Sequence, residues 1–140
     1  MSSNQSGNEE KISAPRLHRF FQHVSNNNLD LSRQNLTDKD MPEIIQFLLQ
    51  NPNVKALDLS LNNIGDEGIA YFAERNQHII SANFEGNNIS DQGVAVFAYK
   101  NQAVEEVNFS HNLISDQGIS NFVKINEICL HSQFSTIQLH

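Results

Sequence analysis

The residues of this chain that could perform catalysis or bind metal are its histidines, its cysteine and one serine–histidine pair. His18 and His23 are five residues apart, whereas two metal-binding histidines on one helical face are spaced by four. Cys129 takes a position that is apolar in each copy of an internal repeat, as a small buried hydrophobe would. Ser110 and His111 come without the nucleophile elbow or oxyanion loop of a hydrolase. We therefore expect no enzyme, no cofactor and no metal site, with a hydrolase around Ser110 and His111 as an alternative.

Composition narrows the class of protein further. The 140 residues carry 9 basic and 16 acidic side chains, and the formal charge of −7 argues against nucleic acid as the main partner. No apolar run approaches the ~18 residues that a membrane-spanning helix requires. The N-terminus lacks the apolar region of a secretory signal peptide. The single cysteine excludes an intrachain disulfide, which fits a reducing, cytoplasmic compartment.

Asparagine accounts for 19 of the 140 residues, and its positions follow an internal repeat. Three copies begin at Leu57, Ala82 and Val107, 25 residues apart. An earlier copy begins at Leu29, and a stub begins at Ser132. Each copy starts with alternating apolar residues, which predict a short strand, and continues with apolar residues at i, i+3 and i+4, which predict a short helix. The chain is therefore expected to stack strand–helix units.

Polar residues mark both ends of each predicted helix. Serine or glycine followed by aspartate precedes the later helices, where side-chain oxygens can cap the helix N-terminus. An asparagine follows each helix, and we expect it in the left-handed conformation that ends many helices. These asparagines are Asn51, Asn76, Asn101 and Asn126. The first helix is expected from Met41 to Gln50.

The pattern L-x-L-x-x-N-x-L in these copies, with valine or isoleucine three residues ahead and D-x-G behind, resembles the leucine-rich repeat of the ribonuclease-inhibitor type. The resemblance covers about residues 29–140. It implies an α/β fold, a right-handed solenoid with a parallel sheet on the concave face and helices on the convex face. Parallel strands stack about 4.8 Å apart and packed helices about 8–10 Å apart, so curvature is expected on spacing grounds as well.

Asn62, Asn87 and Asn112 recur where the chain turns inward after each strand. Backbone groups buried at such a turn have no ladder partner, and each unpaired group costs about 1–3 kcal/mol. An amide side chain can both donate to such groups and accept from them. We therefore predict a structural column of asparagines that bridges successive turns.

Three regions are expected along the chain: a disordered tail over residues 1–12, an N-terminal capping helix over residues 13–25, and a leucine-rich-repeat domain over residues 26–140. This domain would hold about four repeats and the C-terminal stub. Basic residues lie between the apolar positions of the capping helix. A helix that lies on a membrane surface is therefore an alternative for this segment. At the other end, Phe134, Ile137 and Leu139 either form a bare final strand or dock onto a partner or a second copy.

The polar, mildly acidic face of the predicted sheet is the main candidate for binding a partner protein. The residues expected there are Asp30, Ser32, Arg33, Asp58, Ser60, Leu61, Asn83, Glu85, Asn108, Ser110, His111 and Gln133. Among them Arg33, Leu61 and His111 form one edge column, which is the first place to look. A second candidate surface, on the helical side, holds Tyr71, Glu74, Arg75, Tyr99 and Lys100.

The sequence is therefore interpreted as a non-catalytic protein–protein interaction module that presents a rigid surface. Short repeat proteins of this type resemble both eukaryotic adaptors and bacterial effectors. The second resemblance implies delivery to a host cytosol by a route independent of a signal peptide. The alternative is a self-associating structural module, a weak homodimer through its open C-terminal edge. Neither a nucleic-acid partner nor a membrane span is expected.

Overall fold

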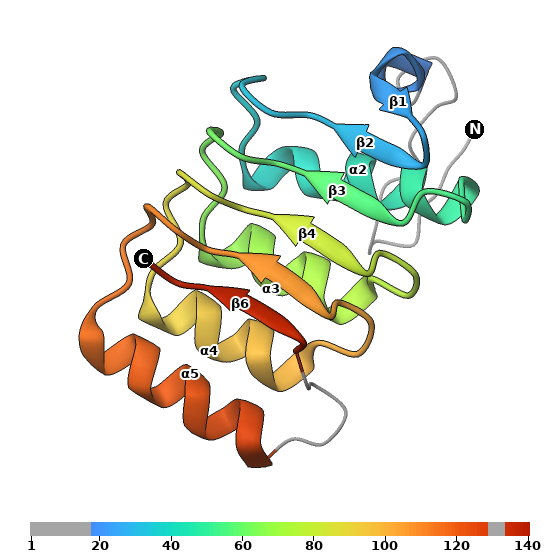
Figure 1. Cartoon of the computed structure of the whole chain (residues 1–140). Coiled ribbons are helices and arrows are strands. Elements are labelled where there is room, and N and C mark those ends of the chain that lie inside the picture. Colours follow the sequence, from blue (N-terminus) through green and yellow to red (C-terminus); the bar gives the residue numbers. More distant parts are fainter. Residues whose placement is uncertain (1–17, 129–133) are drawn as a thin grey trace, which may run out of the picture.

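The computed structural model describes residues 18–128 and 134–140, which form a six-stranded sheet with helices along one side (Figure 1). The strands lie across the sheet in chain order. The first pairing is antiparallel, and the other four are parallel. The strands are β1 (Val24–Ser25), β2 (Asn28–Asp30), β3 (Ala56–Asp58), β4 (Ser81–Asn83), β5 (Glu106–Asn108) and β6 (Thr136–Gln138).

A helix connects each parallel strand to the next, so the predicted α/β solenoid of strand–helix units is confirmed. The first of these helices, α2, begins and ends where the sequence pattern predicts. The helices are η1 (His18–His23), η2 (Asp38–Asp40), α2 (Met41–Gln50), α3 (Asp66–Arg75), α4 (Asp91–Lys100) and α5 (Asp116–Ile128). In Figure 1, α2 to α5 lie along the same side of the sheet, and η1 lies beside β1 at the end of the sheet.

The core lies between the sheet and the helices. The middle residue of each strand from β2 to β5 points into it, as the alternating pattern predicts, and none of the four is more than 3% exposed. Phenylalanines from helices and from the chain after the strands meet there, with ring centroids 5.1–6.4 Å apart in edge-to-face and stacked pairs. These phenylalanines are Phe72, Phe84, Phe97, Phe109 and Phe122.

The asparagines after the strands bridge neighbouring repeats. Asn87 is buried, and its Oδ1 accepts a hydrogen bond from the Ile64 N–H at 2.8 Å. Its Nδ2 donates to one backbone carbonyl of the preceding repeat and one of its own, at 2.9 and 3.0 Å. Asn62 and Asn112 make equivalent bonds one repeat earlier and one repeat later. This column pairs the backbone groups that the strands leave unpaired.

A second column of bridges, which the sequence pattern did not predict, joins the starts of the helices. The Asp66 carboxylate accepts a hydrogen bond from the Ser90 N–H at 2.8 Å and another from the Ser90 hydroxyl at 2.5 Å. Each bridge therefore runs from the helix start of one repeat to that of the next. Equivalent bonds join Asp38 to Gly65 and Asp91 to Ser115.

A glycine in the first turn of each later helix makes room for these carboxylates. A Cβ atom added at Gly93 would collide with Oδ1 of Asp66, and one added at Gly118 would collide with Oδ1 of Asp91. The recurring D-x-G spacing in the sequence is the signal from which these bridges could have been predicted. Its aspartate serves the next repeat, and its glycine accommodates the aspartate of the preceding repeat.

The predicted left-handed conformation at the helix ends is wrong. Asn76 and Asn101 have extended backbones, with φ of −70° and −62° and ψ of 129° and 136°. The reason is a local bridge, in which Asn76 accepts a hydrogen bond from the Ile79 N–H and donates to the Ile79 carbonyl, both at 2.9 Å. The prediction that Asn126 ends its helix is also wrong, because α5 continues to Ile128.

The segment before the first repeat differs from one continuous helix. Residues 1–17 lie outside the described part of the chain, and with them the tail expected over residues 1–12 and the start of the capping helix expected over residues 13–25. The described remainder is the 3₁₀ helix η1, followed by the short strand β1. The helix ends at His23 because the backbone of Val24 pairs with Leu29 of β2.

This segment packs on the N-terminal end of the array through two phenylalanines, Phe20 and Phe21, and one cation, Arg19. Phe20 is 2% exposed and meets Phe47 of α2 edge-to-face, with ring centroids 5.5 Å apart. Arg19 donates two hydrogen bonds to the Glu43 carboxylate, at 2.9 and 3.0 Å. Glu43 is buried, so this bidentate pair supplies the charge partner that a buried carboxylate needs.

The C-terminal stub adopts a different register from the predicted one. A spacing of 25 residues places Gln133 beside Asn108, whereas β6 pairs Gln138 with Asn108. The connection is longer because α5 has 13 residues where α4 has 10. Gln138 therefore takes the place in the sheet that the 25-residue period assigns to Gln133. Gln133 and Cys129 themselves lie outside the described residues.

Candidate protein-binding surface

The face of the sheet opposite the helices, which we call the open sheet face, carries rows of side chains that run across the strands. In-register parallel pairing places equivalent residues side by side. The first row contains Asn28, Ala56, Ser81, Glu106 and Thr136. The second row contains Asp30, Asp58, Asn83, Asn108 and Gln138. A third row, two residues further along the chain, contains Ser32, Ser60, Glu85 and Ser110.

The second and third rows hold residues that the sequence pattern places on this face. The first row was missed, although the same alternation, read one step before each buried strand residue, could have found it. Ser60 is only 7% exposed, so its side chain offers little surface to a partner. Glu106 is exposed and adds a carboxylate to the face.

The second row is held in place by hydrogen bonds within each repeat. In four of its residues, Asp30 to Asn108, one side-chain oxygen accepts a bond from the backbone N–H two residues later. The distances are 3.0 Å for Asp30, 2.9 Å for Asp58, 3.0 Å for Asn83 and 2.9 Å for Asn108. This arrangement is that of an Asx turn, which aspartate and asparagine both form. It gives these four residues one shared side-chain orientation.

The bond from the Ser32 backbone and a second one from the Ser32 hydroxyl, at 2.7 Å, both reach Oδ1 of Asp30. These two donors favour the ionised carboxylate and hold the pKa of Asp30 below its usual range. The nearby His23 acts in the same direction. Asp30 is therefore negatively charged at neutral pH.

The edge of the open sheet face is formed by residues with left-handed backbones. Arg33, Leu61 and His111, the predicted edge column, have φ of 58°, 59° and 58°, and Gly86 in the same column has φ of 71°. The backbone N–H groups of Arg33, Leu61 and Gly86 each donate to a carbonyl in the next repeat, at 2.8–3.1 Å. The left-handed region is costly for a residue as bulky as leucine, so Leu61 is a strained position.

Leu61 is also an exposed apolar residue, with 43% of its surface accessible. Its side chain lies against Gly86, where an added Cβ would collide with Cδ2 of Leu61. Next along the edge, Nε2 of His111 lies 3.8 Å from Oε2 of Glu85. His111 is therefore turned toward a carboxylate. The edge presents a cation, an apolar side chain and a histidine in sequence.

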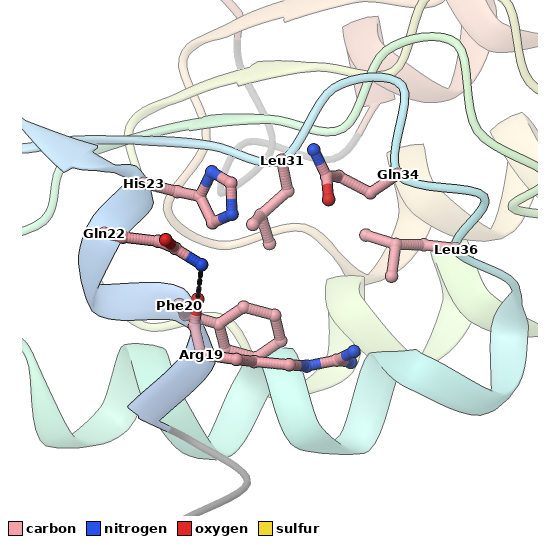
Figure 2. A pocket seen from close by; sticks show the side chains of 7 residues that line it. All are labelled: Arg19, Phe20, Gln22, His23, Leu31, Gln34 and Leu36. Carbon is pink, nitrogen blue, oxygen red and sulfur yellow. Dashed lines mark hydrogen bonds between the residues drawn. The ribbon is translucent and has the colours of Figure 1, made fainter.

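Two hollows lie on or beside this surface. A groove of about 230 Å³ lies over β4, β5 and β6 and is lined by Ser81, Ala82, Asn83, Glu106, Val107, Asn108, Thr136 and Gln138. A smaller pocket of about 120 Å³ lies at the N-terminal end of the array. Figure 2 shows the side chains that line it, the apolar Phe20, Leu31 and Leu36 and the polar Arg19, Gln22, His23 and Gln34. The groove belongs to the open sheet face, and the pocket lies at the end of the array.

The residues considered for catalysis or metal binding are now placed in the structure. Within residues 18–128 and 134–140, no group of three or more histidine, cysteine, aspartate or glutamate side chains is placed to hold a metal ion. No helix in these ranges is long and apolar enough to cross a membrane. Ser110 and His111 lie in the third row and the edge column, and the ion-pair partner of His111 is Glu85.

The second candidate surface, on the helices, forms a network of its own. The Arg75 guanidinium lies 3.7 Å from the centre of the Tyr71 ring, and Glu74 pairs with Arg75 and with Lys100 at 3.3 and 3.7 Å. Tyr99 is 62% exposed. The Glu74–Lys100 pair joins α3 to α4, and the other contacts lie within α3, so several of these side chains already have partners within the chain.

The repeats seen in the fold match a known family. A family model described as a leucine-rich repeat matches residues 50–73, 75–98 and 100–123, which is more than half of the chain. The chain therefore belongs to the leucine-rich repeat family. Among solved structures, it is similar to one titled "Leiomodin-1 Actin-Binding Site 2 (ABS2)", with a TM-score of 0.70 and 16% sequence identity, over 94% of this chain and 81% of that one. This likeness concerns the fold. A comparison with curated protein sequences finds no match.

Proposed function

We propose that the chain is a non-catalytic module that binds a partner protein on its open sheet face. The observation that carries the proposal is the set of in-register polar rows, fixed by local turns and hollowed by a groove of about 230 Å³. Leucine-rich repeats are a protein-interaction fold, and side chains already fixed before binding reduce the entropy lost on association. The leiomodin structure is titled as actin-binding, and for this chain it supports only a protein-binding role.

The edge column supplies the anchor points of such an interface: an arginine, an exposed leucine and a histidine. A few residues supply most of the binding energy of an interface, and arginine, the type of Arg33, is enriched among them. Leu61 supports the proposal because glycine or asparagine would suit its left-handed backbone better than leucine does. An exposed leucine at such a position therefore points to a role in binding.

The test is affinity capture of interacting proteins from a cell lysate with the tagged full chain and two triple variants. One variant carries Arg33→Ala, Leu61→Ala and His111→Ala on the edge of the open sheet face. The matched control carries Glu74→Ala, Tyr99→Ala and Lys100→Ala on the helices. We expect the first variant to lose proteins that the wild type and the control retain. Loss by the control alone would move the binding surface to the helices.

A second candidate function, self-association through the C-terminal end, is favoured by the exposure of α5. Val123 is 43% exposed, whereas the equivalent Ala73 and Ala98 are 3% and 0% exposed because the next helix covers them. A concentration-dependent dimer that dissociates on Val123→Asp, measured by light scattering, would support this function. A monomer at all concentrations would exclude it.

We further propose a reducing compartment for the protein, the cytoplasm of its own cell or a host cytosol. The proposal is supported by a chain of 140 residues with one cysteine, which cannot form an intrachain disulfide. Fractionation of cells that express the tagged chain tests the first location. A translocation reporter fused to the chain tests delivery into a host, which is the effector role.

A further inference from the structure

The second row of the open sheet face changes its hydrogen-bonding character halfway along the array. Asp30 and Asp58 stand in the N-terminal half, and Asn83, Asn108 and Gln138 stand in the C-terminal half. In the four residues from Asp30 to Asn108, one side-chain oxygen is occupied by the turn to the backbone two residues later. The atom left for a partner is therefore the other terminal atom of each side chain.

That remaining atom differs between the two halves. In Asp30 and Asp58 it is a carboxylate oxygen, which can only accept hydrogen bonds when ionised. In Asn83 and Asn108 it is the Nδ2 amide group, which can only donate. Nδ2 of Asn108 already donates one hydrogen bond to Oε1 of Glu85 at 3.5 Å, and the second hydrogen of this amide remains for a partner. The turn fixes the orientation of each amide, because the backbone N–H requires the oxygen on its side. The row is thus an acceptor surface at one end and a donor surface at the other.

Charges around the row restrict the partner further. In the described part of the chain, Asp30 and Asp58 take part in no ion pair, although the charge of the nearby His23 acts on Asp30. Two carboxylates on adjacent strands are therefore available to a cation of a partner. The donor half borders the carboxylates of Glu85 and Glu106, which would repel an acidic side chain. Neutral carbonyl groups are therefore the acceptors that fit the amides of Asn83 and Asn108.

We propose that the open sheet face binds an extended segment of a partner protein that carries a lysine or arginine at one end. The cation lies between Asp30 and Asp58, and main-chain carbonyls of the same segment accept hydrogen bonds from Asn83 and Asn108. With strands about 4.8 Å apart and about 3.3 Å per extended residue, these carbonyls lie about two to four residues from the basic one. The proposal rests on the proposed function of this face as a protein-binding surface.

The test selects ligands from a library of random twelve-residue linear peptides on the immobilised full chain, and then measures binding of the selected peptides by fluorescence anisotropy. The chain variant is Asp30→Asn with Asp58→Asn, in which the asparagine oxygens can keep both turns. The matched control, Glu67→Gln with Glu127→Gln, makes the same change of net charge on exposed helical positions. Melting curves check that both variants remain folded.

We expect selected peptides to share one basic position and to bind the Asp30→Asn, Asp58→Asn variant about tenfold more weakly, as loss of a charge-assisted contact predicts. The control should bind within about twofold of wild type, and replacing the basic peptide residue by glutamine should remove the difference between wild type and variant. Side-chain amide NMR signals of Asn83 and Asn108 should shift on peptide addition, which places the segment over both halves.

Equal weakening in the variant and the control would overturn the inference, because binding would then follow net charge alone. Peptides without a shared basic position, or without effect on the two amide signals, would overturn it too. If these peptides still lose binding to the Arg33, Leu61, His111 triple variant, the open sheet face keeps its binding function with another ligand chemistry. If they do not, the proposed function of this face fails as well.

Discussion

Ser90 and Asp66 join two neighbouring repeats through a pair of hydrogen bonds, at 2.8 Å from the Ser90 N–H and 2.5 Å from its hydroxyl. Both bonds end on one ionised carboxylate, so both are charge-assisted. Each residue also stands at the start of a helix. The pair therefore fixes the position of one helix on the next, and the same relationship recurs between Asp91 and Ser115.

The first prediction concerns this column of aspartates. Asp66→Ala should lower the free energy of unfolding by about 1.5 kcal/mol more than Asp116→Ala, measured by urea denaturation. Both substitutions remove a negative charge from the first turn of a helix, so their effects on the helix dipole match. Only Asp66 has a following repeat that donates to it in the described structure. Equal losses would show that the inter-repeat bonds contribute nothing.

The second prediction concerns the loss of stability at acidic pH. Hydrogen bonds from the Ser115 hydroxyl, and then from the Ser115 N–H, hold the pKa of Asp91 below its ordinary value of 3.8. A carboxyl whose pKa is lower in the folded state contributes stability above the unfolded pKa and loses it as pH falls through the folded pKa. Urea midpoints should therefore fall between pH 7 and about pH 3, and less so in Ser115→Ala. Ser120→Ala, an exposed serine of α5, is the control and should behave as wild type.

The third prediction concerns the asparagine column. Asn87→Ala should lower the free energy of unfolding by about 2 kcal/mol, because it leaves the buried Ile64 N–H and two carbonyls without a side-chain partner. The neighbouring Asn88 is exposed, and Asn88→Ala should change stability by less than about 0.5 kcal/mol. A melting temperature of Asn87→Ala equal to that of wild type would contradict a bridging role.

The fourth prediction separates stability from function at Leu61. Asparagine tolerates the left-handed backbone that leucine adopts here, with φ of 59°. Leu61→Asn should therefore leave the free energy of unfolding unchanged or raise it by up to about 1 kcal/mol, while capture of the partner weakens. A loss of stability greater than about 1 kcal/mol would mean that the contact of Leu61 with Gly86 outweighs the strain.

Several features of the fold could be predicted from residue order because their causes are local or strictly periodic. Alternation marked the strands, the i, i+3, i+4 spacing marked the helices, and α2 has the predicted bounds. The asparagine column could be predicted because backbone groups must be paired wherever the chain turns inward. Most of the open sheet face followed from the same alternation, although its first row, including Glu106, was missed.

Other features depended on contacts that the pattern does not contain. The register of β6 depends on how far α5 extends, so a period of 25 residues does not identify Gln138 as the neighbour of Asn108. The conformation of Asn76 depends on a bridge to Ile79, which outweighed the general preference of asparagine for left-handed helix ends. The 3₁₀ helix η1 gives way to β1 because the edge of β2 offers a strand partner.

The sequence by itself determined the repeat, the type and order of the elements, and the residues available for binding, because periodicity and hydrophobicity act along the chain. Only the tertiary structure decided which atoms of those residues face outward. Asp58 and Asn83 look equivalent as polar strand residues. Once the backbone two residues later takes one oxygen from each, the first offers an acceptor to a partner and the second a donor.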